Sequence, residues 1–276
     1  MLTLTDVTRS LGGNPALRGV RLAVAEGERI ALVGPSGAGK TSLFRVLNLT
    51  LRPDGGTYLL AGQDTAALRG AERRAARSRI ATIHQQHDLV GRMTALENVL
   101  SGRLGRWNAW QALGARLFPR ASDVEEAAEV LRRVEMLDRI GDRADRLSGG
   151  QQQRVAIARA LFQDARVILA DEPVASVDPG LQEEIVRLLV ETSERDGRTL
   201  LVNLHHPHLA LRFFPRIVAL REGRVAFDRP CGEVDGGLLR DLFGGDPGPI
   251  GDAAADSPAT GPRVTRPACR PTDVGI

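Results

Sequence analysis

The sequence has little cysteine, almost no lysine and no long apolar run. Two cysteines, Cys231 and Cys269, in 276 residues are too few for a disulfide framework and suit a reducing cytoplasm. No stretch of about 18 uncharged apolar residues occurs, so we expect no segment that spans a bilayer. The first six residues alternate in polarity and include an acid, unlike a secretory signal. Hydrophobic residues at 42% and charged residues at 26% are typical of a globular protein of one large or two small domains.

Lysine is represented once. The chain has 37 basic and 34 acidic residues, and Lys40 is the only lysine, so 37 − 1 = 36 basic residues are arginine. A bias toward arginine explains the 36 but not the exception. Because an ammonium is compact and a guanidinium is a planar fork, we expect Lys40 to occupy a place where the fork does not fit. A net charge of +3, with bases scattered among acids, predicts no nucleic-acid partner.

Short apolar runs alternate with helical patterns along most of the chain. This alternation predicts an α/β protein with a parallel sheet covered by helices on both faces. The region 89–162 has a mainly helical pattern. Strands are expected at 2–7, 20–24, 30–33, 58–61, 80–83, 167–170, 199–204 and 217–220, and helices at 40–51, 124–137 and 181–192.

The last 31 residues, 246–276, differ from the rest in composition. They contain six prolines and four glycines, a proportion typical of a disordered segment. We therefore expect the globular part to end near residue 245.

A glycine-rich segment follows the apolar run 30–33. Residues 34–41 read GPSGAGKT and match G-x-x-x-x-G-K-[ST], with a helical pattern opening at the lysine. Glycines let backbone N–H groups surround phosphate oxygens, and the helix N-terminus adds a favourable dipole. We expect Lys40 to reach the β- and γ-phosphates and the Thr41 hydroxyl to ligate Mg²⁺. A bare match can arise by chance, but the strand–loop–helix context argues against chance. The predicted phosphate-binding residues are Gly34, Pro35, Ser36, Gly37, Ala38, Gly39, Lys40, Thr41 and Ser42.

Two acids, Asp171 and Glu172, end the apolar run 167–170. Ligands of open α/β sheets bind at the carboxyl ends of strands. Asp171 is therefore predicted to hold Mg²⁺, and Glu172 to orient or deprotonate the attacking water. Alone, such a pair would suggest a solvated turn; the phosphate loop upstream favours a catalytic site.

Residues 147–154, LSGGQQQR, precede a helical pattern that ends near Phe162. Ser148 is a natural N-cap, and the N–H groups of Ser148, Gly149 and Gly150 would form a second anion site. One chain does not need two γ-phosphate sites, but a two-fold dimer does. We therefore predict that each protomer offers these residues to the ATP held by the other's phosphate loop.

With these motifs in this order, residues 2–245 resemble the ATP-binding-cassette (ABC) ATPases. The resemblance implies a P-loop NTPase (RecA-like) core with an antiparallel β subdomain and a helical subdomain at about 89–162. It implies ATP and Mg²⁺ as cofactors. It also implies a second copy of the chain and integral membrane permease subunits as partners, and indirectly a periplasmic substrate-binding protein. The expected location is the cytoplasmic face of the inner membrane.

The resemblance assigns roles to three further residues. Gln85 matches the glutamine that contacts Mg²⁺ and senses the γ-phosphate, with Gln86 as the competing register. Asp178 lies in a Ser-Val-Asp-Pro segment that resembles the D-loop, although Val177 replaces the usual leucine. His205 matches the switch histidine that contacts the γ-phosphate. A metal cluster of His205 with neighbouring histidines is the alternative, which the lack of Cys or carboxylate spacing disfavours.

Softer similarities, including residues 85–90, 95–102 and 205–221, resemble the phosphonate-import group of these ATPases. Two alternatives stay open: a soluble accessory ATPase of phosphonate breakdown, and an importer of another cargo such as amino acids or phosphate. A DNA-repair or chromosome-type ATPase is disfavoured. Gln85 and Ser148 are 148 − 85 = 63 residues apart, without the sustained heptads of a coiled-coil arm.

Residues at helical spacing between 102 and 119 have two interpretations. They form a core face of the helical subdomain, or an apolar patch that docks the membrane partner. By resemblance, Met93 and Leu96 are better candidates for receiving the partner's coupling helix. The spaced residues are Trp107, Trp110, Leu113 and Leu117.

Leu11 occupies the position where the family usually has an aromatic residue that stacks on adenine. Base–aromatic stacking contributes about 1–3 kcal/mol per base, and leucine has no π-face. We therefore predict weak discrimination between ATP and GTP, measured as the dissociation constants of both nucleotides. A strong ATP preference in the wild type, or equal affinity losses in Leu11→Ala and Leu11→Tyr, would contradict the prediction.

Overall fold

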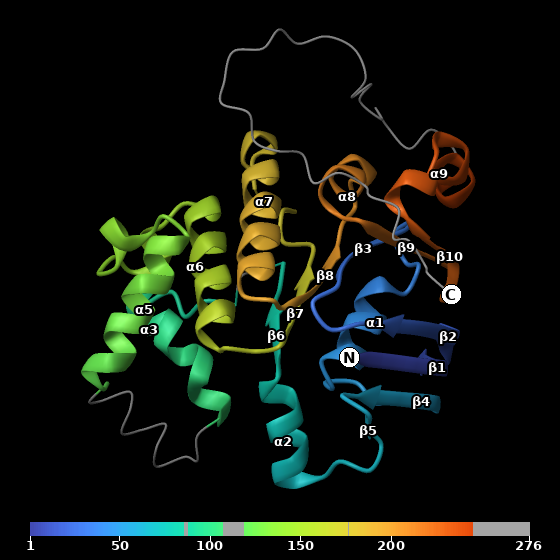
Figure 1. Cartoon of the computed structure of the whole chain (residues 1–276), viewed down its shortest axis with the longest axis horizontal. Helices are drawn as coiled ribbons and strands as arrows, with labels where there is room; N and C mark the ends of the chain where they lie inside the picture. Colours follow the sequence, from blue (N-terminus) through green and yellow to red (C-terminus); the bar gives the residue numbers. More distant parts are fainter. Residues whose placement is uncertain (86–87, 107–118, 176, 245–276) are drawn as a thin grey trace, which may run out of the picture.

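The structure, a computed structural model, describes residues 1–85, 88–106, 119–175 and 177–244. They form two sheets and the helices that surround them (Figure 1). The larger sheet has the strand order β10-β9-β3-β8-β7-β6 and the smaller one β2-β1-β4-β5. The strands are β1 (Leu2–Leu11), β2 (Asn14–Val24), β3 (Arg29–Val33), β4 (Gly55–Leu60), β5 (Gln63–Asp64), β6 (Ile80–Ile83), β7 (Val167–Asp171), β8 (Thr199–Asn203), β9 (Arg216–Arg221) and β10 (Arg224–Pro230).

The larger sheet is parallel except at one edge. Strands β6, β7, β8, β3 and β9 run in the same direction, and β10 pairs with β9 antiparallel. Successive residues of β3 pack into different cores: Ala31 and Val33 into one, and Ile30 and Leu32 into the other. Both faces are therefore covered, as near-continuous apolar strands require. The predicted α/β class is confirmed, and so is the antiparallel β subdomain, which is the four-stranded sheet.

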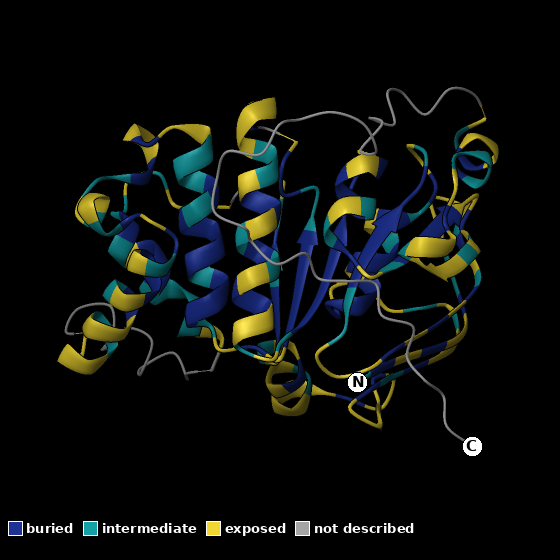
Figure 2. Cartoon of the chain, turned by 45° about the horizontal axis from the view of Figure 1, so that its top comes forward, coloured by how far each residue is buried: buried dark blue, intermediate teal, exposed yellow. Residues whose placement is uncertain are grey.

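The helices divide between the two faces. Helix α1 lies between the two sheets and buries its apolar side in the core that it shares with the antiparallel sheet. Helices α3, α5, α6, α7 and α8 pack on the opposite core, so the buried strands of Figure 2 lie between two layers. The helices are α1 (Lys40–Leu47), α2 (Gly70–Ser78), α3 (Ala95–Leu100), η1 (Ser101–Arg106), α5 (Ala121–Arg133), η2 (Leu137–Arg139), η3 (Ala144–Arg146), α6 (Gly149–Phe162), α7 (Pro179–Arg195), α8 (Pro207–Phe213), η4 (Cys231–Glu233) and α9 (Gly236–Phe243).

Helix α1 is shorter than the prediction of 40–51. It ends at Leu47, where Asn48 caps it and Leu49 adopts a left-handed φ of 61°. The Asn48 side-chain oxygen accepts hydrogen bonds from the backbone N–H and the hydroxyl of Thr50, at 3.0 and 2.6 Å. The side chain thus stabilises a turn before residue 51, where the predicted helix ends.

The predicted helix 124–137 also ends early, at Arg133. Glu135 has a left-handed φ of 58°, and the N–H of Met136 donates to the Leu131 carbonyl oxygen at 2.8 Å. This is the bonding pattern of a left-handed helix terminus, here without glycine. Helix α2 was not predicted, because only Ala76 of it is buried and its sequence has no apolar stripe.

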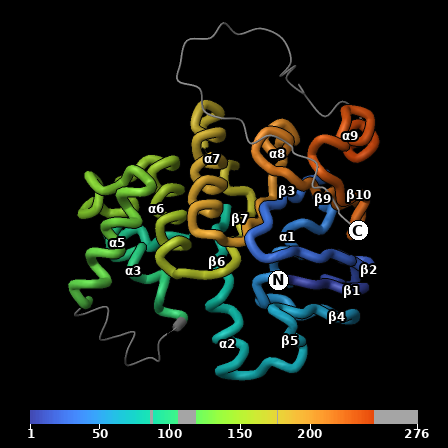
Figure 3. Tube along the Cα trace, in the orientation of Figure 1, coloured from blue at the N-terminus to red at the C-terminus, as the bar shows by residue number. Residues whose placement is uncertain are grey.

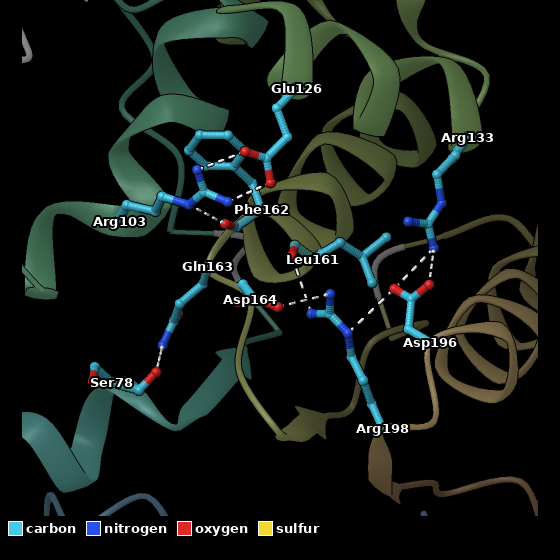
Figure 4. A network of polar contacts seen from close by, with 10 residues as sticks. All are labelled: Ser78, Arg103, Glu126, Arg133, Leu161, Phe162, Gln163, Asp164, Asp196 and Arg198. Carbon is cyan, nitrogen blue, oxygen red and sulfur yellow. Dashed lines mark hydrogen bonds and ion pairs between the residues drawn. The ribbon is translucent and has the colours of Figure 1, made fainter. Parts of the chain in front are cut away.

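The C-terminal end of α6 is held by side chains from two other parts of the chain and by its own C-cap residue, Gln163 (Figure 4). Arg103 Nε donates to the carbonyl oxygen of Phe162 at 2.9 Å, and Arg198 donates to that of Leu161 at 3.0 Å. The Gln163 amide donates to the last carbonyl oxygen of α2 at 3.2 Å. The end of this helix is therefore fixed to the sheet and to its neighbours.

The trace in Figure 3 shows α3, α5 and α6 side by side, apart from the antiparallel sheet. This is the group of helices expected within 89–162. The predicted tail at 246–276 and the residues Trp107, Trp110, Leu113 and Leu117 lie outside the described part of the chain. Among the described helices, none has the length and apolar character needed to cross a bilayer.

Candidate functional site

The parallel register brings three segments to one edge of the larger sheet. In the strand pairing, Asn203 lies opposite both Leu32 and Asp171. The loop after β3, the acids that end β7 and the histidine after β8 therefore meet, as the motifs predict. They surround a cavity of about 250 Å³ lined by Ala16, Ser36, Gly37, Ala38, Gly39, Lys40, Thr41, Ser42, Glu172 and His205.

Two glycines of the loop are required by close backbone contacts. A Cβ on Gly34 would lie 2.1 Å from the Leu220 carbonyl oxygen, and one on Gly39 would lie 2.5 Å from that of Ala16. Both also have positive φ, 147° and 101°. Helix α1 begins directly after Gly39, so its unbonded N–H groups lie at the cavity. Such a glycine-rich cradle at a helix N-terminus fits a phosphate group.

The lone lysine is enclosed by this loop. Lys40 is 5% exposed, and its Nζ donates to the carbonyl oxygens of Gly34 and Pro35 at 2.7 and 3.0 Å. Burial lowers the pKa of Lys40, and the nearby carboxylates of Glu172 and Asp171 oppose this shift. The site therefore holds one enclosed cation beside two acids.

Asp171 and Thr41 supply oxygen donors next to this cation. The Asn203 Nδ2 donates to Asp171 Oδ1 at 2.6 Å. Burial raises the pKa of Asp171, whereas the Asn203 bond lowers it, and a smaller lowering comes from the Thr41 hydroxyl. A carboxylate and a hydroxyl are hard oxygen ligands, so these two residues fit Mg²⁺.

Glu172 and His205 both line the cavity and are in direct contact with each other. His205 Nε2 lies 2.5 Å from Glu172 Oε1, and both residues line the cavity with Lys40. Glu172 has a left-handed φ of 51°, and its N–H donates to the Asn203 carbonyl oxygen at 3.2 Å. The sequence predicted both residues at the site, but not their direct contact with each other.

Ser148 is the N-cap of α6, as predicted. Its hydroxyl accepts the Gln151 N–H at 3.3 Å, and the Gln151 side-chain oxygen accepts the Ser148 N–H at 3.0 Å. This reciprocal pair is a capping box. Ser148, Gly149 and Gly150 do not line the cavity of their own chain. Their predicted contact with a nucleotide therefore needs a second copy.

The other predicted site residues are exposed. Gln85 follows β6, and Asp178 precedes α7 without a side-chain capping bond. Gln86 lies outside the described residues. Leu11 is 36% exposed at the end of β1 and is not part of the cavity lining, although Ala16 of the neighbouring strand is.

The histidines after β8 do not form a metal cluster. His206 and His208 have ring centroids 5.6 Å apart, and burial lowers the pKa of His208. Within the described ranges, no three or more His, Cys, Asp or Glu residues form a group that could hold a metal ion. The residue that sequence reasoning missed is Asn203; the only signal was a polar residue directly after the apolar run 200–202.

The sheet, the glycine loop and the paired acids define a P-loop nucleotide-binding protein. Comparison with protein families matches residues 17–175 to the family described as ABC transporter. The chain belongs to this family, which confirms the resemblance seen in the sequence motifs.

Similar curated proteins cover nearly the whole chain. A phosphonates import ATP-binding protein, PhnC 2, of Pseudomonas aeruginosa (strain UCBPP-PA14) is 45% identical over 93% of this chain and 95% of its own. A PhnC 2 of Synechococcus sp. (strain JA-2-3B'a(2-13)) is 45% identical over 84% of this chain and 86% of its own. Among solved structures, the dimeric cassette MJ0796 in a post-hydrolysis state with ADP and Pi is 32% identical. Its TM-score is 0.71, over 84% of this chain and 99% of that one.

We expect Lys40→Arg to reduce ATP affinity and ATPase activity by at least about 10²-fold. The enclosed space between two carbonyl oxygens accepts a point charge but not a planar fork. Nucleotide titration and steady-state phosphate release measure the effect.

Arg45→Lys is the matched control, because Arg45 is an exposed residue on the same helix. It should bind and hydrolyse ATP like the wild type. An active Lys40→Arg protein would show that the single lysine has no special role.

Proposed function

We propose that this chain is the ATP-hydrolysing subunit of a bacterial importer that takes up phosphonate or a related phosphorus oxyanion. The observation that carries hydrolysis is the cavity in which Lys40, Glu172 and His205 meet. Similarity to proteins named phosphonates import ATP-binding protein supports the cargo.

The residues of the cavity suit phosphoryl transfer to water. Glu172 accepts a proton from the attacking water while the water oxygen bonds to the γ-phosphorus. The bond between the γ-phosphorus and the oxygen that bridges it to the β-phosphate breaks, which leaves ADP and phosphate. His205 and Lys40 stabilise the charge on the γ-phosphoryl oxygens. Thr41 and Asp171, with Gln85, would hold Mg²⁺, which would neutralise phosphate charge when bound.

The second copy completes each site. Ser148, Gly149 and Gly150 present the N-terminal N–H groups of α6, and Asp178 is exposed at the start of α7. All four lie outside the cavity of their own chain. The similar MJ0796 cassette is dimeric with ADP and Pi bound. Two copies of this chain related by a two-fold axis would enclose each ATP between Lys40 of one and Ser148 of the other.

A basic groove offers a docking site for the membrane subunits. A cavity of about 730 Å³ lies between α2 and β6 on one side and η1 and α6 on the other. Arg73, Arg74 and Arg77 of α2 and Arg159 of α6 line it. The pKa of Arg73 is lowered by burial and by the neighbouring arginines. An acidic cytoplasmic segment of a permease fits this groove and would hold the chain at the inner face of the membrane. By resemblance, Met93 and Leu96 complete the docking region.

Reconstitution with the permease and the periplasmic binding protein tests this function. We expect ATPase activity to rise when phosphonate is present on the binding-protein side, and to rise less with phosphate or phosphite. If amino acids stimulated the ATPase activity instead, the chain would belong to an importer of another cargo. A chain that never co-purifies with membrane subunits would favour the soluble accessory ATPase.

The double variant Arg74→Glu, Arg77→Glu is the control for docking. Both side chains are exposed and neither lines the phosphate-loop cavity, so soluble ATPase activity should persist while co-purification with the permease is lost.

We predict that Glu172→Gln traps a closed, ATP-bound dimer. The amide keeps the shape of the side chain but cannot take the proton from water, so binding persists while turnover falls by about 10²–10⁴-fold. Size-exclusion chromatography with light scattering, with and without ATP, measures the dimer.

Glu183→Gln is a suitable comparison, because Glu183 bonds to Arg212 on the surface. It should turn over ATP normally and form no stable dimer. Recovery of monomers alone from Glu172→Gln with ATP would contradict the shared-site arrangement.

A further inference from the structure

Asn203 is a buried polar residue at the carboxyl end of β8, directly after the apolar run 200–202. All five residues of β8 are buried, and Asn203 is 0% exposed. Its Oδ1 is buried and has no hydrogen-bond partner in the part of the chain that the structure describes. Burial of an amide with an unbonded oxygen is unfavourable, and an apolar residue at this position would avoid that cost. Asparagine here therefore requires a compensating role.

Asn203 contacts both acids of the site. Its side-chain Nδ2 donates to Asp171 Oδ1 at 2.6 Å, and its main-chain carbonyl oxygen accepts the backbone N–H of Glu172 at 3.2 Å. The first bond fixes the carboxylate through one oxygen and leaves the other oxygen free of Asn203. The second bond holds the backbone of Glu172. This residue has a left-handed φ, and its side chain contacts His205.

The sheet places these groups on the side of the phosphate loop. Asp171 has the same parity along β7 as Val167 and Leu169, which pack in the core that contains α1. Asn203 pairs with Asp171 and has the same parity as Leu201 in that core. The amide therefore bonds to the acid from the neighbouring strand, and the Thr41 hydroxyl of α1 is close enough to the same carboxyl group to lower its pKa.

We infer that Asn203 is a positioning residue that orients the Asp171 carboxylate for a divalent cation beside the nucleotide. The inference rests on the proposed function, because it assumes that Asp171 holds the metal. Removal of a residue that hydrogen-bonds to a metal-ligating side chain commonly lowers metal affinity by about 10–100-fold.

The test compares Asn203→Leu and Asn203→Ala with the wild type, using Mn²⁺ as the probe. Asn203→Leu keeps approximately the volume of the side chain. Asn203→Ala leaves an unfilled space and so introduces no steric clash. Electron paramagnetic resonance of Mn²⁺ in the presence of ATP gives the metal dissociation constant, and a fluorescent ATP analogue without metal gives nucleotide affinity. We expect the Mn²⁺ constant to rise at least about tenfold in both variants, while metal-free nucleotide affinity stays within about twofold.

Thr199→Val is the matched control. Thr199 is 0% exposed at the other end of β8, and its hydroxyl accepts the Gly27 N–H at 2.9 Å. This variant loses a buried polar group from the same strand and should keep the wild-type Mn²⁺ constant. Folded Asn203 variants with Mn²⁺ constants within about twofold of the wild type would overturn the inference.

A crystal structure of the wild-type chain with Mg²⁺ and a non-hydrolysable ATP analogue tests the inference without any substitution. We expect the Asn203 Nδ2 to Asp171 Oδ1 contact to persist, with the metal bonded directly or through water to the other oxygen. An amide rotated away from Asp171 would overturn it. A wild type that binds no ATP, or binds it without any metal dependence, would instead refute the proposed function itself.

Discussion

The site depends on one buried cation. Taking an ammonium group out of water is unfavourable unless fixed oxygen atoms replace its hydration. For Lys40 these are the carbonyl oxygens of Gly34 and Pro35, with two carboxylates close by. The loop can present its backbone in this way only because Gly34 and Gly39 lack a Cβ. The glycine pattern and the single lysine are therefore two aspects of one electrostatic requirement.

The parallel sheet converts distant segments into one surface. Because β7, β3 and β8 run in the same direction, their carboxyl ends lie together, although β3 precedes β7 and β8 by more than a hundred residues in the chain. The antiparallel sheet contributes through Ala16, whose carbonyl oxygen packs against Gly39. The subdomains thus cooperate in shaping the phosphate loop, while the helices α3, α5 and α6 contribute nothing to the lining of that cavity.

Sequence reasoning was most successful where backbone chemistry restricts the choice of residue. Residues 36–42 of the phosphate loop line one cavity with Glu172 and His205, and Ser148 caps α6. The motifs placed these residues there because glycine, carboxylate and capping residues have few substitutes. It was least successful at helix ends formed without glycine, as at Leu49 and Glu135. It also could not identify Asn203, whose role depends on a neighbouring strand and not on its own segment.

The fixed end of α6 has a mechanical consequence. The C-terminal end of α6, which precedes β7, is held by hydrogen bonds of Arg103, Arg198 and Gln163. Ser148 lies at the opposite end, 14 helical residues away. Fourteen residues span about 20 Å, so a tilt of about 5° at the anchored end displaces the serine by about 2 Å. A small change in the tilt of α6 about this end would therefore be amplified at Ser148.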